Sequence, residues 1–315
     1  MPQKVILDCD PGHDDALAIL LAGAAPELEL LAITTVAGNQ TLPKTTLNAR
    51  RVASAAGLRV PIAAGADRPL VRPQRVAGNI HGESGLDGPT FAGEPDVALD
   101  PRHAVELIVE VVMAHPGEVV LIPVGPLTNI ALAMRREPAI IERIRHISIM
   151  GGAWGLGNQT PSAEFNILVD PEAARIVMDS GAPITLVPLE LTHQAKAMPD
   201  VIERFDAIGT PLGHLSAELL RFFASTYKAI HGFEGPPLHD PCAVAWVIDP
   251  TIVETKPVHV DVETHGEFTY GRTAIDIHGV TGLPVNAQVG VRLDVARYWD
   301  LMVGAVASYG RPVRS

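Results

Sequence analysis

The sequence predicts an α/β protein with a mostly parallel, mixed central sheet and helices on both faces of that sheet. Short apolar, β-branched runs alternate with helical patterns along the chain, as is typical of such a sheet. The chain has 315 residues, of which 47% are hydrophobic, which is enough for a substantial core. No Ser/Pro-rich linker, composition shift or repeat period divides it, so we expect a single domain over residues 1–315.

Strands and helices are expected to alternate in the first two thirds of the chain. Each expected strand is a short apolar run, and each expected helix has apolar residues at helical spacing. The strands cover residues 4–7, 28–35, 60–63, 119–124, 146–150 and 184–189, and the helices cover 16–24, 44–56, 104–114, 129–135 and 171–180. Because ligands of such sheets bind at the carboxyl ends of the strands, the residues after each strand are the first candidates for a site.

The last third of the chain has a less regular pattern. We expect helices at 201–205, 215–230 and 295–308, and strands at 258–262, 273–277 and 287–293 that return to the core. Two segments, 68–94 and 232–238, fit neither element. The first is rich in Pro and Gly and contains Asn79-Ile-His-Gly-Glu-Ser-Gly-Leu-Asp87, whose polar groups suit a flap over an active site.

Composition excludes several classes of partner. The formal charge is −12, and no cluster of Lys or Arg could follow a phosphate backbone, so we expect no nucleic acid partner. No apolar run approaches the ~20 residues of a membrane span, and the N-terminus does not resemble a signal peptide. We therefore expect a soluble, cytoplasmic protein without a membrane partner. Cys9 and Cys242 lack zinc-binding spacing and are expected to be reduced packing residues.

The most informative feature is a group of four carboxylates, Asp8, Asp10, Asp14 and Asp15, between an apolar strand and an apolar helix. Like charges at such a place cost several kcal/mol in desolvation and repulsion unless a cation neutralises them. The Pro11-Gly12 turn lets the chain fold back so that Asp10 and Asp15 converge on one hard metal ion. The alternative is a solvated acidic turn that caps the helix.

Two further polar clusters lie far along the chain. Asp240, in Leu238-His-Asp-Pro-Cys242, precedes Pro241 and an apolar helix, which would place its carboxylate at a helix N-terminus. The Gly-rich loop 155–166 offers Asn158, Glu164 and Asn166, and amides with a carboxylate suit vicinal hydroxyls because each hydroxyl both donates and accepts. An ordinary helix cap and an ordinary polar loop are the alternatives.

Together these clusters resemble the inosine-uridine preferring nucleoside hydrolase family. The opening Asp8-Cys-Asp-Pro-Gly-His-Asp-Asp15 resembles the metal and base motif of that family. Other stretches match it in position and order over most of the chain, namely Val124-Gly-Pro-Leu-Thr-Asn129, Met150-Gly-Gly152, Ala163-Glu-Phe-Asn166, Asp170-Pro-Glu-Ala173 and His239-Asp240. The resemblance implies the Rossmann-like fold of these hydrolases, a bound Ca²⁺ and hydrolysis of the bond between ribose and base.

The resemblance also implies roles for particular residues. Asp14 would be the general base that takes a proton from metal-bound water. Ca²⁺ would be held by carboxylates and one main-chain carbonyl, all hard oxygen donors: Asp10, Asp15, Asp240 and Val124. Residues expected to contact the ribose or the base are Asn39, Met150, Asn158, Glu164, Asn166 and Asp240. An EF-hand is excluded, because Gly12 stands where that loop needs Asp or Asn.

On the base side, His239 resembles the histidine that could protonate the departing base, although it could instead only orient its neighbour. His81 in the flap and Tyr227 match substrate-side positions. The contexts of His239 and of the flap look more like the pyrimidine-preferring branch, so uridine and cytidine are the expected substrates, with inosine possible. The resemblance further implies a homodimer or homotetramer.

Two other functions remain open at this stage. A metal-dependent phosphohydrolase also places Asp-x-Asp after a strand, but this chain lacks the Lys that would balance a phosphate. An inactive nucleoside-binding or Ca²⁺-binding protein could retain the same fold. Turnover of nucleosides, with release of free base and ribose, separates the hydrolase from both.

Overall fold

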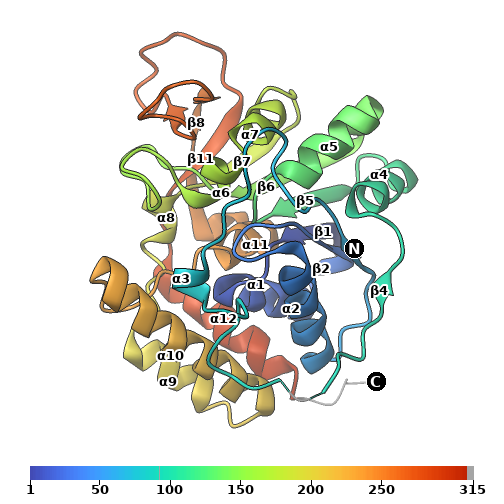
Figure 1. Ribbon diagram of the computed structural model, residues 1–315, viewed down its shortest axis with the longest axis vertical. Helices are drawn as coiled ribbons and strands as arrows, with labels where there is room; N and C mark the ends of the chain where they lie inside the picture. Colours follow the sequence, from blue (N-terminus) through green and yellow to red (C-terminus); the bar gives the residue numbers. More distant parts are fainter. Residues whose placement is uncertain (92, 311–315) are drawn as a thin grey trace.

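The computed structural model describes residues 1–91 and 93–310. Its centre is a nine-stranded sheet in the order β4-β3-β2-β1-β5-β6-β7-β11-β8 (Figure 1). All neighbours in this sheet are parallel except β11 and β8. The mostly parallel, mixed α/β fold that the sequence predicts is therefore confirmed. The strands of this sheet are β1 Gln3–Cys9, β2 Leu28–Thr35, β3 Ile62–Ala64, β4 Leu99–Asp100, β5 Val119–Pro123, β6 Ile144–Met150, β7 Ile184–Val187, β8 Val253–Val258 and β11 Ala287–Leu293.

Helices cover both faces of the sheet (Figure 1). Alternate residues of β1 pack into the two layers. Val5 and Leu7 pack against one layer, whereas Ile6 packs against the other. The first layer contains α1 His13–Ala24, α2 Leu42–Ala55, α9 Pro199–Asp206, α10 Pro211–His231, α11 Pro241–Ile248 and α12 Val295–Ser308, and the second contains α4 Ala104–Ala114, α5 Thr128–Arg136 and α7 Pro171–Met178.

Strand order places the acidic motif at the switch point of the sheet. β1 pairs with β2 on one side and with β5 on the other, and the chain then continues outward in both directions from this pair. In open parallel sheets a crevice forms at the carboxyl ends of the strands where the order reverses. The loop after β1 and the loop after β5 therefore meet at one place, which brings Asp10 and Val124 together.

α1 begins earlier than the sequence pattern indicates. It starts at His13, so Asp14 and Asp15 lie in its first turn rather than in the preceding loop. Carboxylates are favourable there, because the N-terminus of a helix carries a partial positive charge and unpaired N–H groups. This charge offsets part of the cost of gathering acidic side chains at the site.

The prediction of one core strand over 258–262 is wrong. β8 ends at Val258 on the edge of the main sheet, and β9 Val260–Val262 instead pairs antiparallel with β10 Thr273–Ile275 in a separate two-stranded sheet. The side chain of Asn286 explains the break, because its amide bonds the backbone N–H and C=O of Val260 in place of a neighbouring strand. Of the predicted strand 273–277, only Thr273–Ile275 is a strand, and it belongs to this small sheet and not to the main sheet.

Short helices fill places that have no clear sequence signal. They are α3 Gly78–His81, α6 Phe165–Val169 and α8 Leu189–Thr192, and each lies in a segment that approaches the carboxyl ends of the strands. Pro188 ends β7 two residues before the predicted end of that strand. Cys9 and Cys242 are free and buried, as expected of packing residues. None of the helices in the described ranges has the length and apolar character to cross a membrane.

Candidate functional site

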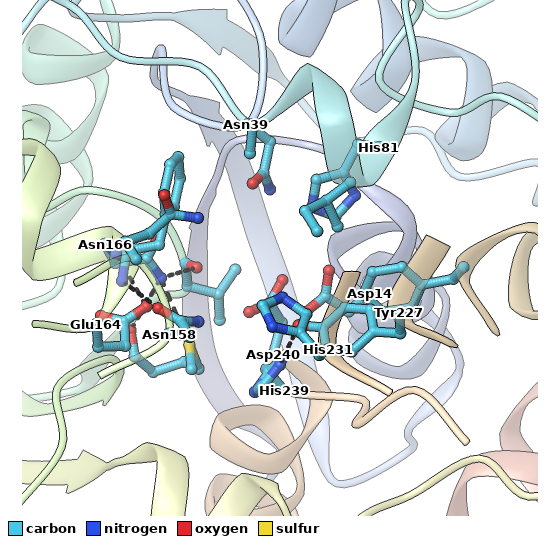
Figure 2. Close-up of a pocket in the computed structure, with 17 residues that line it drawn as sticks. Asp14, Asn39, His81, Asn158, Glu164, Asn166, Tyr227, His231, His239 and Asp240 are labelled. Atoms are coloured by element: carbon cyan, nitrogen blue, oxygen red, sulfur yellow. Dashed lines mark hydrogen bonds between the residues drawn. The ribbon is translucent and has the colours of Figure 1, made fainter. Parts of the chain in front are cut away.

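A pocket lies at the carboxyl ends of the central strands. Figure 2 shows Asn158, Glu164 and Asn166 on one side of it and Asp14 and Asp240 across from them. The lining comes from α1, the flap, the loops after β2 and β5, the end of β6 with the loop that follows it, α6, α10 and the segment before α11. These residues are Asp14, Asn39, Ala77, Ile80, His81, Val124, Met150, Asn158, Gln159, Glu164, Phe165, Asn166, Phe223, Tyr227, His231, His239 and Asp240. Neither Lys nor Arg is among these described residues, so the pocket suits an uncharged or cationic ligand better than a phosphate.

Asp15 fixes the loop that carries the acidic motif. Its carboxylate accepts the backbone N–H of Asp10 at 3.0 Å and that of Gly12 at 2.9 Å, and it also accepts the side-chain amide of Asn39 at 3.1 Å. The turn at Pro11-Gly12 thus folds back on the helix as the sequence predicts. Asp15 and Asp10 do not line the pocket but lie behind residues that do, because Asp15 is close to Asp14 and Asp240 and Asp10 bonds the backbone of Asn39.

Asp10 occupies a tightly shaped cradle. Its Oδ2 accepts the backbone N–H of Asn39 at 2.6 Å, whereas its buried Oδ1 has no hydrogen-bond partner within the described residues. Two glycines make room for this carboxylate. A Cβ at Gly38 would lie 2.1 Å from Oδ2, and a Cβ at Gly125 would lie 2.4 Å from Oδ1. The sequence therefore builds a buried carboxylate whose Oδ1 lacks the partner that a buried polar atom normally has, as far as residues 1–91 and 93–310 show.

Three further carboxylates meet close to Asp10, whose backbone N–H bonds one of them, Asp15. One oxygen each from Asp14, Asp15 and Asp240 lies within 4.8 Å of the others, and all three residues are buried. Burial, together with a smaller effect of the nearby Asp15, raises the pKa of Asp14 to about 8. The pKa of Asp240 is raised well above its usual range by burial and by Asp14 and Asp15. Asp240 precedes α11, and its side chain makes no capping hydrogen bond, so it is free to face the site as predicted.

The opposite wall carries the amides and Glu164. Glu164 begins α6, and its carboxylate accepts the backbone N–H groups of Asn166 and Ile167 at 2.9 and 3.2 Å and that of Gly152 at 2.9 Å. Burial nevertheless raises its pKa to about 7. The Asn166 amide donates to the carbonyl oxygen of Val124 at 2.8 Å, which links this wall to the acidic side of the pocket.

His239 and Tyr227 form a hydrogen-bonded pair at one end of the pocket. Nε2 of His239 lies 2.9 Å from the Tyr227 hydroxyl, and Nδ1 lies 2.7 Å from Oγ1 of Thr192. Burial lowers the pKa of His239 well below its usual range, with a smaller effect from His193 and His231. Phe223 packs edge-on against Tyr227 with ring centroids 4.7 Å apart. This end of the pocket is aromatic and suits a planar ring.

The flap is anchored to the first motif. Nδ1 of His81 accepts the backbone N–H of His13 at 3.2 Å, and Nε2 of His13 lies 2.8 Å from the carbonyl oxygen of Asp87. His13 also stacks on Phe223. His13 therefore serves local structure, as the sequence indicates, and His81 is brought to the pocket by α3. The amide of Asn48 bonds the carbonyl oxygens of Pro11 and Ser84 and ties the same two segments together.

The residues that the sequence predicts for the site converge on this pocket. Within the lining are Asp14, Asn39, His81, Val124, Met150, Asn158, Glu164, Asn166, Tyr227, His239 and Asp240, with Asp10 and Asp15 behind them. Sequence reasoning missed Gln159, Phe223 and His231 as lining residues and Thr192 as the partner of His239. For Gln159 the signal was present, because it follows Asn158 in the same loop.

The pocket thus combines an acidic side, a wall of amides and an aromatic end at the switch point of a parallel sheet, an arrangement that can hold a polyhydroxylated group next to a planar ring. The sequence model of the family described as inosine-uridine preferring nucleoside hydrolase matches residues 5–300. The chain belongs to this family, and it is a ribonucleoside hydrolase.

Individual relatives agree with this assignment. The chain is 47% identical, over 98% of both chains, to the pyrimidine-specific ribonucleoside hydrolase RihB of Escherichia coli K12. Among solved structures, a purine-preferring ribonucleoside hydrolase from Gardnerella vaginalis superposes with a TM-score of 0.91 at 32% identity, covering 98% of this chain and 99% of that one. An inosine-uridine preferring nucleoside hydrolase from Bacillus anthracis, at 22% identity, shares the fold with a TM-score of 0.80 over 97% of this chain and 99% of that one.

Proposed function

We propose that this enzyme hydrolyses the N-glycosidic bond of pyrimidine ribonucleosides, with uridine and cytidine as preferred substrates, in a Ca²⁺-dependent reaction. The observation that carries the proposal is the opposition of two sets of groups across one pocket. Asp14 and Asp240 face Asn158, Glu164 and Asn166, with the His239 and Tyr227 pair at one end (Figure 2). The pyrimidine preference is supported by 47% identity to a relative named pyrimidine-specific, against 32% to one named purine-preferring.

The residues at and behind the acidic side of the pocket fit a Ca²⁺ ion. The buried Oδ1 of Asp10 has no partner in the described chain, and Asp14, Asp15 and Asp240 bring three carboxylate oxygens within 4.8 Å of one another. Asp10, Asp15, Asp240 and the Val124 carbonyl would hold the ion, and all four offer the hard oxygen donors that Ca²⁺ prefers. When bound, Ca²⁺ would neutralise the buried carboxylates, accept ribose hydroxyls as further ligands and make a water easier to deprotonate.

This metal assignment predicts a specific pH dependence of stability. Burial raises the folded-state pKa of Asp8 and Glu164 to about 7 and that of Asp14 to about 8, so the metal-free protein binds more protons than its unfolded chain. The contribution of these groups to stability is present below about pH 4 and is lost as pH rises through about 7 to 8. The melting temperature in chelator should therefore fall between about pH 5 and 8, while the increase on adding Ca²⁺ should grow. The metal assignment would be contradicted if Ca²⁺ did not raise the melting temperature, or raised it equally at about pH 5 and about pH 8.

Asp14 is placed to act as the general base. Its carboxylate is buried and lies against Asp15 and Asp240, and the backbone amides of His239 and Asp240 offset part of the rise in its pKa. In the reaction a water oxygen forms a bond to C1′ of the ribose, and Asp14 takes one of the water protons. The bond from C1′ to the base nitrogen breaks, and its electron pair leaves with the base. Positive charge develops on the sugar in the transition state, and the acidic side of the pocket stabilises it.

Ribose binding is assigned to the amide-bearing wall. Asn158, Glu164 and Asn166 together offer donors and acceptors, which vicinal hydroxyls require. The backbone amides that bond Glu164 fix its orientation, so its remaining lone pairs are already directed when the sugar arrives. Holding the sugar from this wall presents C1′ to the acidic side for attack by water. Asn39 and Met150 complete the surroundings of the sugar.

The departing base takes up a proton from the His239 and Tyr227 pair. These side chains are joined at 2.9 Å, and Thr192 orients the imidazole from its other nitrogen. This proton donation matters only when the base is a poor leaving group. The loss of rate on removing the donors should therefore differ between substrates with poor and good leaving groups. His81, on the flap, contacts the substrate from the remaining side of the pocket.

Tyr227→Phe and His239→Ala are expected to lower kcat for uridine by roughly 10²-fold. Hydrolysis of 4-nitrophenyl β-D-riboside, whose leaving group departs as a stable anion, should fall less than about 5-fold in the same variants. Steady-state rates on both substrates measure the difference. Equal losses on the two substrates would show that these residues only shape the pocket.

A further inference from the structure

Two neutral polar side chains in the pocket lining have no hydrogen-bond partner elsewhere in the described chain. They are Gln159 and His231, whereas Asn39, His81, Asn158, Asn166, Tyr227 and His239 all bond other protein groups. Both free side chains are on exposed residues, which places them at the mouth of the pocket and not at its acidic side. A free amide at the mouth is available to a ligand.

The backbone that carries Gln159 is held firmly although its side chain is free. The Gln159 N–H donates to the carbonyl oxygen of Ala163 at 3.2 Å, and Oδ1 of Asn158 accepts the N–H of Phe165 at 2.9 Å. At Gly157 a Cβ would lie 2.1 Å from the Ala163 carbonyl oxygen, so the loop closes tightly on itself. Gln159 thus follows a proposed ribose-binding residue on a fixed loop, and only its side chain must adjust to a base.

The positions of the polar groups on a pyrimidine ring indicate which part of the base Gln159 contacts. With the ribose held by Asn158, Glu164 and Asn166 as proposed, the base would extend toward the mouth of the pocket, whose lining includes Phe165 and Phe223. In a pyrimidine nucleoside the 4-position is the ring atom opposite the glycosidic nitrogen, so it points away from the sugar and toward the mouth. That position carries an acceptor oxygen in uracil and a donor amino group in cytosine. A primary amide has both a donor and an acceptor, and it exchanges them by rotation.

We propose that Gln159 is a specificity-determining residue that accepts both uracil and cytosine at the 4-position. Its NH₂ group donates to the O4 oxygen of uracil, and its carbonyl oxygen accepts from the N4 amino group of cytosine. The inference rests on the proposed hydrolysis of pyrimidine nucleosides. It adds the side chain that recognises the base by hydrogen bonding. It also explains how one pocket can use two pyrimidines whose polar edges have opposite donor patterns.

The test is the ratio of kcat/KM for cytidine to that for uridine in Gln159→Glu and Gln159→Leu. Glu has nearly the same shape but only accepts, so the ratio should rise by about 10-fold or more, chiefly through loss of uridine hydrolysis. Leu neither donates nor accepts, so both substrates should fall by roughly 10-fold with little change in the ratio. The riboside of pyrimidin-2-one, which lacks a 4-substituent, should be hydrolysed by wild type and Gln159→Leu at similar rates.

Leu156→Glu is the matched control for charge. Leu156 lies in the same loop, is 77% exposed and does not line the pocket, so this variant adds a carboxylate near the mouth without facing the base. Its ratio should stay within about 2-fold of wild type. An equal shift in this control, or an unchanged ratio in Gln159→Glu while wild type hydrolyses both nucleosides, would overturn the proposal. Failure of wild type to hydrolyse either nucleoside would instead overturn the proposed function.

Discussion

Asp14→Asn is expected to lower kcat for uridine hydrolysis on the order of 10³-fold, because an amide cannot take the proton of the attacking water. The substitution keeps the size of the side chain in the first turn of α1 and retains one oxygen toward Asp15 and Asp240. An amide stays uncharged at every pH, so above about pH 8, where Asp14 ionises in the metal-free protein, the metal-free variant should be at least as stable as wild type. Initial rates at saturating uridine, with excess Ca²⁺, measure the effect.

A measurement of Ca²⁺ binding distinguishes a general base from a metal ligand among these aspartates. The melting temperature of Asp14→Asn should still rise on adding Ca²⁺, because Asp10, Asp15 and Asp240 are unchanged. Asp10→Asn is the matched comparison, since the buried Oδ1 of Asp10 has no partner in the described chain and Asp10 does not line the pocket. That variant should lose the Ca²⁺-dependent rise in melting temperature. Activity of Asp14→Asn within about 10-fold of wild type would exclude Asp14 as the base.

2′-Deoxyuridine is expected to react with a kcat/KM on the order of 10⁴-fold below that of uridine. Without the 2′-hydroxyl, the polar groups on the ribose wall are buried against a carbon–hydrogen bond and lose a partner. Glu164 is 2% exposed, so water reaches it poorly once the pocket is filled. Competition between the two nucleosides in one reaction, followed by chromatography, measures the ratio directly.

Glu164→Gln provides the control for this discrimination. The variant should hydrolyse uridine more slowly and should prefer it over 2′-deoxyuridine by a smaller factor, because part of the hydroxyl recognition is gone. Its carbonyl oxygen can still accept one of the backbone N–H groups that hold Glu164, so α6 should remain folded. Hydrolysis of 2′-deoxyuridine by wild type within about 10-fold of uridine would contradict the assignment of this wall to ribose.

The parts of the fold that the sequence predicts best are those with local causes. The bounds of β2, β11 and α12 agree with the predicted ranges, because each is a continuous pattern bounded by turn or cap residues. The division between β8 and β9 depends instead on Asn286, whose amide bonds Val260 from 26 residues away. The local sequence around Val260 does not indicate such a contact.

The same distinction applies to the site. Asp10, Asp14 and Asp15 are predictable because they lie in one motif after a strand, and Asp240 because it precedes a proline and a helix. Thr192 was missed, since its contact with His239 spans 47 residues and its surroundings are an ordinary short helix. Phe223 was missed because an aromatic residue in an amphipathic helix is usually part of the core.

Release of ribose and free base from uridine, cytidine, inosine and adenosine, measured in phosphate-free buffer with Ca²⁺, tests the proposed activity most directly. Equimolar ribose and base, with kcat/KM for uridine and cytidine at least roughly 10-fold above the purine nucleosides, is the predicted result. Preferred release from inosine or adenosine would contradict the pyrimidine preference. No release from any of the four nucleosides, by a folded protein that binds Ca²⁺, would contradict hydrolysis of these ribonucleosides and favour a binding function or an unusual substrate.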